Sequence, residues 1–147
     1  MWHQVTDIIA IKELMDTTNF FHDSCIKEIR YISGAYVDND LFMSPTNTSR
    51  KLSIIIQRQA CDCPVIELEF SKLKCLRLLP LDEEYTSEIY SSTLLLENGF
   101  LYWFDCGGIL ASDIDRYEGV AICAQELRWR TVCGGLGEQV YFEKRSD

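Results

Sequence analysis

The chain has 147 residues, of which 47% are hydrophobic and 12% aromatic, values typical of a globular protein. Its 14 lysines and arginines stand against 23 aspartates and glutamates, a formal net charge of -9. This balance argues against nucleic acid, whose phosphates require basic side chains, and against docking on anionic membranes. It suits a basic protein partner, and the length predicts a single domain spanning residues 1–147.

The first 16 residues carry Asp7, Glu13 and Asp16 and lack the basic and then apolar order of a signal peptide. No run reaches the roughly 18 apolar residues of a membrane span. The chain has seven cysteines, an odd number. Without an export signal we expect reduced thiols and a cytoplasmic protein.

The N-terminal segment, residues 1–19, is expected to be helical, with a helix over residues 5–16. One face carries Ile8, Ile11, Leu14 and Met15, spaced as on one side of a helix. Asp7 or Thr6 can cap its start, because a side-chain oxygen there accepts from free backbone N–H groups. The helix should end at Thr17-Thr18-Asn19.

Residues 20–143 read as an antiparallel β domain centred on residues 51–79. Apolar and polar residues alternate there with a period of two, which is typical of strands with one buried face. Turns at residues 61–64 and 71–72 predict a three-strand meander. Further strands are expected over 25–37, with a turn or bulge at Ser33-Gly34, and over 120–132, with an edge strand at 138–143.

Two turn signals and the tail complete the chain. Asp38-Asn39-Asp40 predicts a turn before a short strand at residues 41–43. Asn98-Gly99 suits a type I′ turn and predicts a hairpin of residues 93–96 with 100–105. Residues 144–147 should be frayed. The fold class is therefore α+β and mainly β: an N-terminal helix packed on a curved antiparallel meander sheet of about seven to nine strands, with closure to a sandwich or barrel as an open alternative.

His22 and Asp23 form the most distinctive polar pair, because a histidine beside an acid can act as a general base. Neighbouring residues of an extended segment point in opposite directions, so the pair is not a ready-made dyad. Asp23 can instead satisfy backbone N–H groups at the junction. An enzyme using His22 is therefore the weakest of the functional hypotheses.

Other candidate binding residues lie on loops and late strands. Asp113 and Asp115 offer oxygen ligands on a loop, but the loop lacks the remaining positions of an EF-hand. Trp103 and Trp129, with Tyr102, could line a ligand cavity, although core packing is the favoured explanation of the same residues. Cys61 and Cys63 are one residue apart without a second pair, which does not suit zinc. We expect no metal and no cofactor.

Residues 20–29, FFHDSCIKEI, and residues 33–37, SGAYV, resemble the start of small uncharacterised bacterial proteins that open with a helix and an FHDS-like junction. Residues 126–130, ELRWR, add to the resemblance. The group carries no established activity. The resemblance implies a bacterial cytosolic domain and transfers no site.

These observations favour a non-catalytic protein-binding module over an enzyme. One concrete form is a protein that neutralises a basic toxin, comparable in kind to immunity proteins, with its acidic surface steering the encounter. The alternative is a β domain that binds a small ligand in the mouth of a curved sheet. Exposed edge strands could also mediate a homodimer.

Overall fold

The computed structural model describes residues 1–59 and 61–145, which form a seven-stranded antiparallel sheet, a small two-stranded sheet and one α-helix. The strands are β1 (His3–Gln4), β2 (Ser24–Ile32), β3 (Tyr36–Val37), β4 (Met43–Ser44), β5 (Lys51–Arg58), β6 (Val65–Leu78), β7 (Thr93–Glu97), β8 (Phe100–Phe104) and β9 (Val120–Thr131). The helical elements are α1 (Ile8–Thr17) and the short 3-10 turns η1 (Asn19–Phe21), η2 (Ala111–Asp113) and η3 (Phe142–Arg145).

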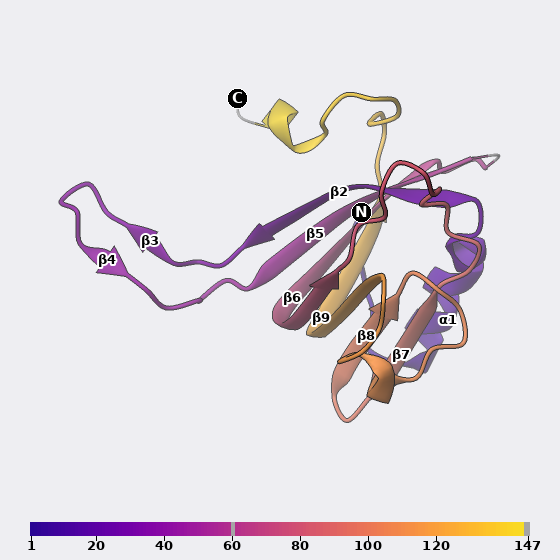
Figure 1. Ribbon diagram of the computed structural model, residues 1–147, viewed down its shortest axis with the longest axis horizontal. Coiled ribbons are helices and arrows are strands. Elements are labelled where there is room, and N and C mark those ends of the chain that lie inside the picture. The colour runs from indigo at the N-terminus through magenta and orange to yellow at the C-terminus, as the bar shows by residue number, and fades with distance from the viewer. Residues whose placement is uncertain (60, 146–147) are drawn as a thin grey trace.

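The large sheet has the strand order β2-β5-β6-β9-β8-β7, and β1 pairs with the far end of β9 (Figure 1). The expected α+β, mainly β class is confirmed. The sheet stays open, with β2 and β7 at its edges, so it closes into neither a sandwich nor a barrel. The face that packs against α1 is called the core face below, and the opposite one the outer face.

Helix α1 begins where the sequence predicts a cap. The Asp7 side chain accepts a hydrogen bond of 2.8 Å from the backbone N–H of Ala10. Leu14 and Met15 are buried in the core, as expected from the apolar stripe. Ile8 is 75% exposed, so its expected place on the buried face is wrong. It is the first residue of the helix, and the buried residues Leu14 and Met15 lie in later turns.

The centre of the sheet is a pair of strands, not the expected three-strand meander. Leu52 of β5 lies opposite Phe70 of β6, and both are fully buried on the core face. The expected turn at residues 71–72 is absent from the described chain, because β6 runs on to Leu78. Lys72 has a φ of +53°, and a bulge follows between Leu73 and Cys75. These features bend the strand without reversing it.

The later hairpin is confirmed. Asn98 and Gly99 have φ values of +52° and +79°, the conformation of a type I′ turn, and they join β7 to β8.

The expected edge strand at residues 138–143 is wrong. The Glu28 carboxylate accepts the backbone N–H groups of Tyr141 and Phe142, the latter at 3.1 Å, so a side chain binds groups that a strand would otherwise pair. Lys144 and Arg145 belong to η3, and residues 146–147 of the expected frayed tail lie outside the described residues.

The segment between β2 and β5 leaves the sheet altogether. Residues 33–49, called the arm here, fold back on themselves as the β3–β4 hairpin and project far from the core (Figure 1). The turn expected at Asp38-Asn39-Asp40 forms the tip. The Asp38 side chain accepts the backbone N–H groups of Asp40 and Phe42, at 2.9 and 3.0 Å.

Candidate functional site

The His22–Asp23 pair lies where η1 gives way to β2. Asp23 has a φ of +56°, so the expectation that the two side chains point apart is wrong. Nε2 of His22 lies 3.3 Å from Oδ1 of Asp23, and Nδ1 lies 2.8 Å from the carbonyl oxygen of Tyr90. Both ring nitrogens thus face acceptors. This geometry ties the junction to the segment before β7, whereas a general base needs a nitrogen turned toward its substrate.

The two tryptophans proposed as ligand contacts lie in the core. Trp103 of β8 is fully buried, edge-on to Phe21 at 5.9 Å between ring centroids. Its Nε1 has no hydrogen-bond partner among the described residues. Trp129 of β9 is also buried, and the His3 ring stacks on it at 4.5 Å. A solute would reach neither ring without displacing packed side chains.

Asp113 and Asp115 lie at and just beyond η2. The Arg116 guanidinium donates to Asp113 at 2.8 Å and holds the pKa of that carboxyl below its ordinary value. Asp115 is exposed. Within residues 1–59 and 61–145, no group of three or more histidine, cysteine or acidic side chains is arranged to hold a metal ion.

The arm carries large apolar side chains in solvent. Leu41, Phe42 and Met43 at its tip are 85%, 72% and 69% exposed, and Tyr36 and Val37 on the opposite strand are exposed too. Between Ser33 and Ser49 the chain has two aspartates and no lysine or arginine. The arm is therefore an apolar, negatively charged projection.

The base of the arm is tightly clasped. The backbone N–H groups of Ser49 and Arg50 both donate to the carbonyl of Ser33, at 2.9 and 3.1 Å. Gly34 has a φ of +94°, and a Cβ there would lie 2.5 Å from the backbone nitrogen of Ser49. A glycine is thus required both by the backbone conformation and by the close approach.

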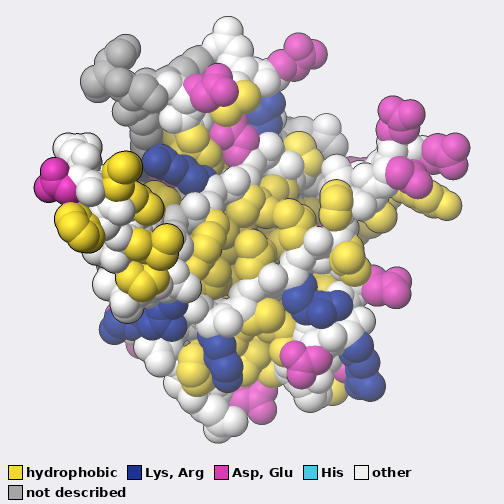
Figure 2. All heavy atoms as spheres, turned by 60° about the vertical axis from the view of Figure 1, so that its left-hand side comes forward, with side chains coloured by type: hydrophobic (Ala, Val, Ile, Leu, Met, Phe, Trp, Pro, Cys, Tyr) yellow, Lys and Arg dark blue, Asp and Glu magenta, His cyan; other side chains and the backbone are white. Residues whose placement is uncertain are grey.

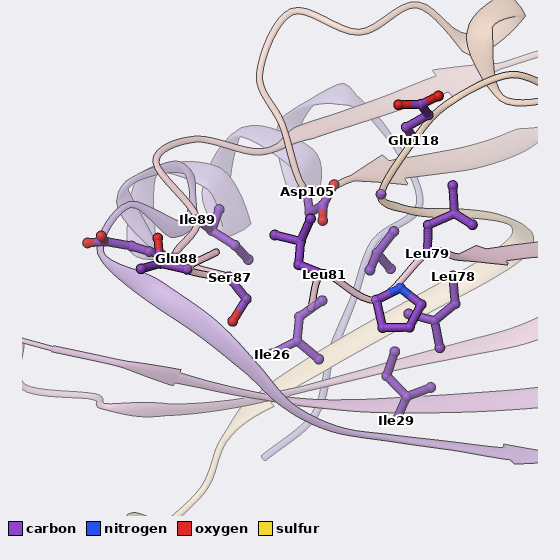
Figure 3. Close-up of a pocket in the computed structure, with 14 residues that line it drawn as sticks. Ile26, Ile29, Leu78, Leu79, Leu81, Ser87, Glu88, Ile89, Asp105 and Glu118 are labelled. Carbon is purple, nitrogen blue, oxygen red and sulfur yellow. The ribbon is translucent and has the colours of Figure 1, made fainter. Parts of the chain in front are cut away.

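A trough on the core face lies between β2 and the far end of β6. Its deeper part has a volume of about 550 Å³, with Ile26 and Ile29 of β2 on one side and Leu78, Leu79 and Leu81 on the other (Figure 3). Figure 2 shows hydrophobic side chains gathered in a hollow at the centre of one face of the molecule. A second hollow of about 450 Å³ lies along the same two strands nearer the arm, lined by Tyr31, Arg50 and residues 73–76, and the two hollows together are called the trough.

Charge is unevenly distributed along the trough. Glu88, Asp105 and Glu118 line the deeper part, whose described lining includes no lysine or arginine. Arg50 and Lys74 line the part near the arm, but the Lys74 ammonium lies over the Phe100 ring of β8, at 4.4 Å, so Arg50 supplies the positive charge there. Tyr117 donates a hydrogen bond of 2.5 Å to Asp105, and burial, together with this bond, raises the pKa of the Tyr117 hydroxyl. The trough therefore has an acidic end and a basic end.

The two ends of the chain cover parts of β9 and β2. Buried Glu67 accepts from Arg130 at 2.6 Å, and Glu69 accepts from Arg128 at 2.7 Å. The Trp2 ring covers both guanidinium groups at 4.3 and 4.4 Å. The Glu28 carboxylate meanwhile accepts the backbone N–H of Phe142 and so holds the C-terminal segment against β2.

The sequence did not predict the arm or the trough as a binding surface. The turn and the short strand at residues 38–43 carried a signal for a hairpin, but none for its separation from the core.

All seven cysteines, Cys61 and Cys63 included, are free thiols. No helix among the described residues is long and apolar enough to cross a membrane. The chain matches no protein-family model, and comparisons with curated proteins and with solved structures returned no match.

Proposed function

We propose that the protein is a non-catalytic protein-binding module that engages its partner through the arm. The observation that carries this proposal is the arm tip, where Leu41, Phe42 and Met43 lie together in solvent on a hairpin detached from the core. Clustered large apolar side chains on a protein surface are typical of interaction sites. A two-stranded hairpin without a packed face gains little stability from them, so folding gives no reason for their presence.

The charge of the molecule indicates the chemistry of the partner. The arm carries Asp38 and Asp40 without a basic side chain, and the whole chain has a net charge of -9. A partner with an apolar cleft bordered by lysine and arginine would match both features, and opposite charge would speed the encounter. A basic toxin held inactive in the cytosol of a bacterium, in the manner of immunity proteins, is one concrete form of such a partner.

The test is affinity capture from the source cells with three forms of the purified protein. Leu41, Phe42 and Met43 are changed to serine in the arm variant. In the matched control, Ile8 and Ile9 are changed to serine, since they are equally exposed apolar residues of α1. We expect the wild type and the control to recover the same basic protein at low salt, with less at high salt, and the arm variant to lose it.

The captured protein is then purified and titrated calorimetrically against all three forms. Recovery of the same proteins by the wild type and the arm variant would exclude the arm as the interaction surface. Recovery of no partner at low salt would count against protein binding altogether.

Small-ligand binding in the trough is the second candidate, favoured by one observation. A volume of about 550 Å³ with a largely apolar lining falls within the range of about 300–1,000 Å³ typical of small-molecule sites. The acids of the deeper part would suit an apolar amine. Thermal-shift measurements with aliphatic amines and with the matching carboxylic acids test it, because only the amines should stabilise the protein.

A further inference from the structure

One edge of β6 lacks a neighbouring strand over its second half. β5 begins at Lys51 and pairs with β6 only along residues 65–70 of β6, because the chain before Lys51 forms the arm. β9 accompanies β6 all the way to Leu78 on the other side. Beyond the bond of 3.1 Å from the Leu73 N–H to the Arg50 carbonyl, no strand of the described chain pairs with this edge. On the β9 side, the Leu79 N–H donates to the Gly119 carbonyl just before β9 begins.

The trough runs along this same edge. Its part near the arm is lined by residues 73–76, and its deeper part begins at Leu78. Across the trough lie Ile26, Ile29 and Tyr31, which pair in register with core-face residues of β5 and so share their face. Leu78 is 48% exposed and points into this space with Ile29 (Figure 3). Unpaired peptide groups and an apolar lining thus occur side by side.

We propose that the free edge of β6 accepts an extended segment of the partner protein as an added strand, antiparallel to β6 and continuing the line of β5. Backbone hydrogen bonds would supply affinity that is independent of sequence, and alternate side chains of the segment would enter the trough. This inference rests on the proposed function, since it assigns a second contact to the same partner.

The polarity of the trough specifies the segment further. An antiparallel strand beside β6 has its N-terminal end near Leu78 and its C-terminal end near Arg50. The acids Glu88 and Glu118 lie at the first end, and Arg50 lies at the second. The segment that fits carries basic residues at its N-terminal end, apolar residues at alternate central positions and acidic residues at its C-terminal end.

The arm of a second copy is a poorer occupant. Its strands run from Tyr36 to Val37 and from Met43 to Ser44, with Asp38 and Asp40 between them and no basic residue before either. With the second strand in the trough, these aspartates would approach the acidic end, and the first strand has no basic residue before it to meet the acids there. Self-association through the trough therefore counts as an outcome that contradicts the proposal.

The test uses the full-length protein and peptides with capped ends. The probe is Lys-Lys-Val-Thr-Val-Thr-Val-Glu-Glu, and its control exchanges the Lys and Glu pairs at the two ends. Two further probes carry backbone N-methyl groups on alternate central residues. One probe is methylated at the three valines and the other at the two threonines, so that each set of methyl groups faces one side of the strand. In an added strand the amides of one phase face β6, so methylation in that phase should weaken binding at least tenfold and methylation in the other should not.

Hydrogen exchange locates the site. We expect the probe to slow exchange at alternate amides between Leu73 and Leu79. Leu78→Lys should weaken binding at least tenfold, because it places a cation in the apolar lining. Leu96→Lys should leave binding unchanged, because Leu96 is similarly exposed (40%) but lies on β7. Far-UV circular dichroism establishes that both variants are folded.

Several results would overturn the inference. They are equal binding of the probe and its charge-exchanged control, equal effects of the two methylation phases, protection elsewhere in the chain, or no binding at about 1 mM peptide. Dimerisation of the wild type that Leu78→Lys abolishes would assign the edge to a second copy. Failure here with retained capture through the arm rejects the added strand alone, whereas loss of capture rejects the proposed function.

Discussion

Trp103 was expected either to pack in the core or to contact a ligand, and replacing it tests the core role. The side chain is fully buried, and its Nε1 has no hydrogen-bond partner among the described residues. Phenylalanine removes two ring carbons, which costs roughly 1.6 kcal/mol at ~0.8 kcal/mol per buried carbon. It also removes an unpaired buried N–H group, whose burial costs about 1–3 kcal/mol. The two effects oppose each other, so Trp103→Phe should change the free energy of unfolding by less than about 1 kcal/mol.

Trp103→Ala has no compensating gain. It empties a fully buried site that Phe21 faces edge-on and should destabilise the protein by about 3–5 kcal/mol. Urea denaturation followed by far-UV circular dichroism measures both variants without relying on the fluorescence of the residue that is changed. If Trp103→Phe costs as much as Trp103→Ala, the indole N–H is bonded and the reasoning fails. If neither costs stability, Trp103 is not a core residue.

Three further predictions follow from other contacts. Asp7→Ala should lower the unfolding free energy by about 1 kcal/mol, because the cap of α1 is lost, and an unchanged urea midpoint would contradict this. Exposed Cys63, Cys106 and Cys133 should react quickly with a thiol reagent at neutral pH, whereas Cys123, whose pKa burial raises, should react only after unfolding. The raised pKa of Tyr117 keeps it protonated in the folded state, while an unfolded tyrosine ionises near pH 10. The contribution of Tyr117 to the free energy of unfolding should therefore be fully present below about pH 10 and be lost above it. Urea midpoints measured against pH should show this fall in the wild type, and the fall should be smaller in Tyr117→Phe.

Local patterns predicted the parts of the fold that local chemistry determines. The Asn98-Gly99 turn formed where expected, because few residues adopt positive φ at two successive positions. The cap at Asp7 and the burial of Leu14 follow from the same kind of short-range rule. The fold class was predictable because a period of two persists through residues 51–57 and 65–70.

The candidate surfaces depended on distant parts of the chain and were not predictable in this way. The same alternation is compatible with a turn at residues 71–72 or with one bent strand. The bent strand forms because β6 pairs with β9 all the way from Ile66 to Leu78. An apolar run such as residues 41–43 reads identically whether other side chains cover it or not. Likewise, the unpaired edge of β6 arises from where β5 leaves the sheet, a property of two strands together.

The clasp at the base of the arm makes the direction of the arm independent of the chemistry of its tip. Ser33, Gly34 and Ser49 set the angle at which the hairpin leaves the sheet, while the exposed apolar side chains of residues 41–43 lie at the far end. A side chain at Gly34 would push against the backbone of Ser49 and re-aim the hairpin without altering any tip residue. Under the proposed function, a single substitution at residue 34 would therefore change which partners the tip reaches without changing the side chains of the tip.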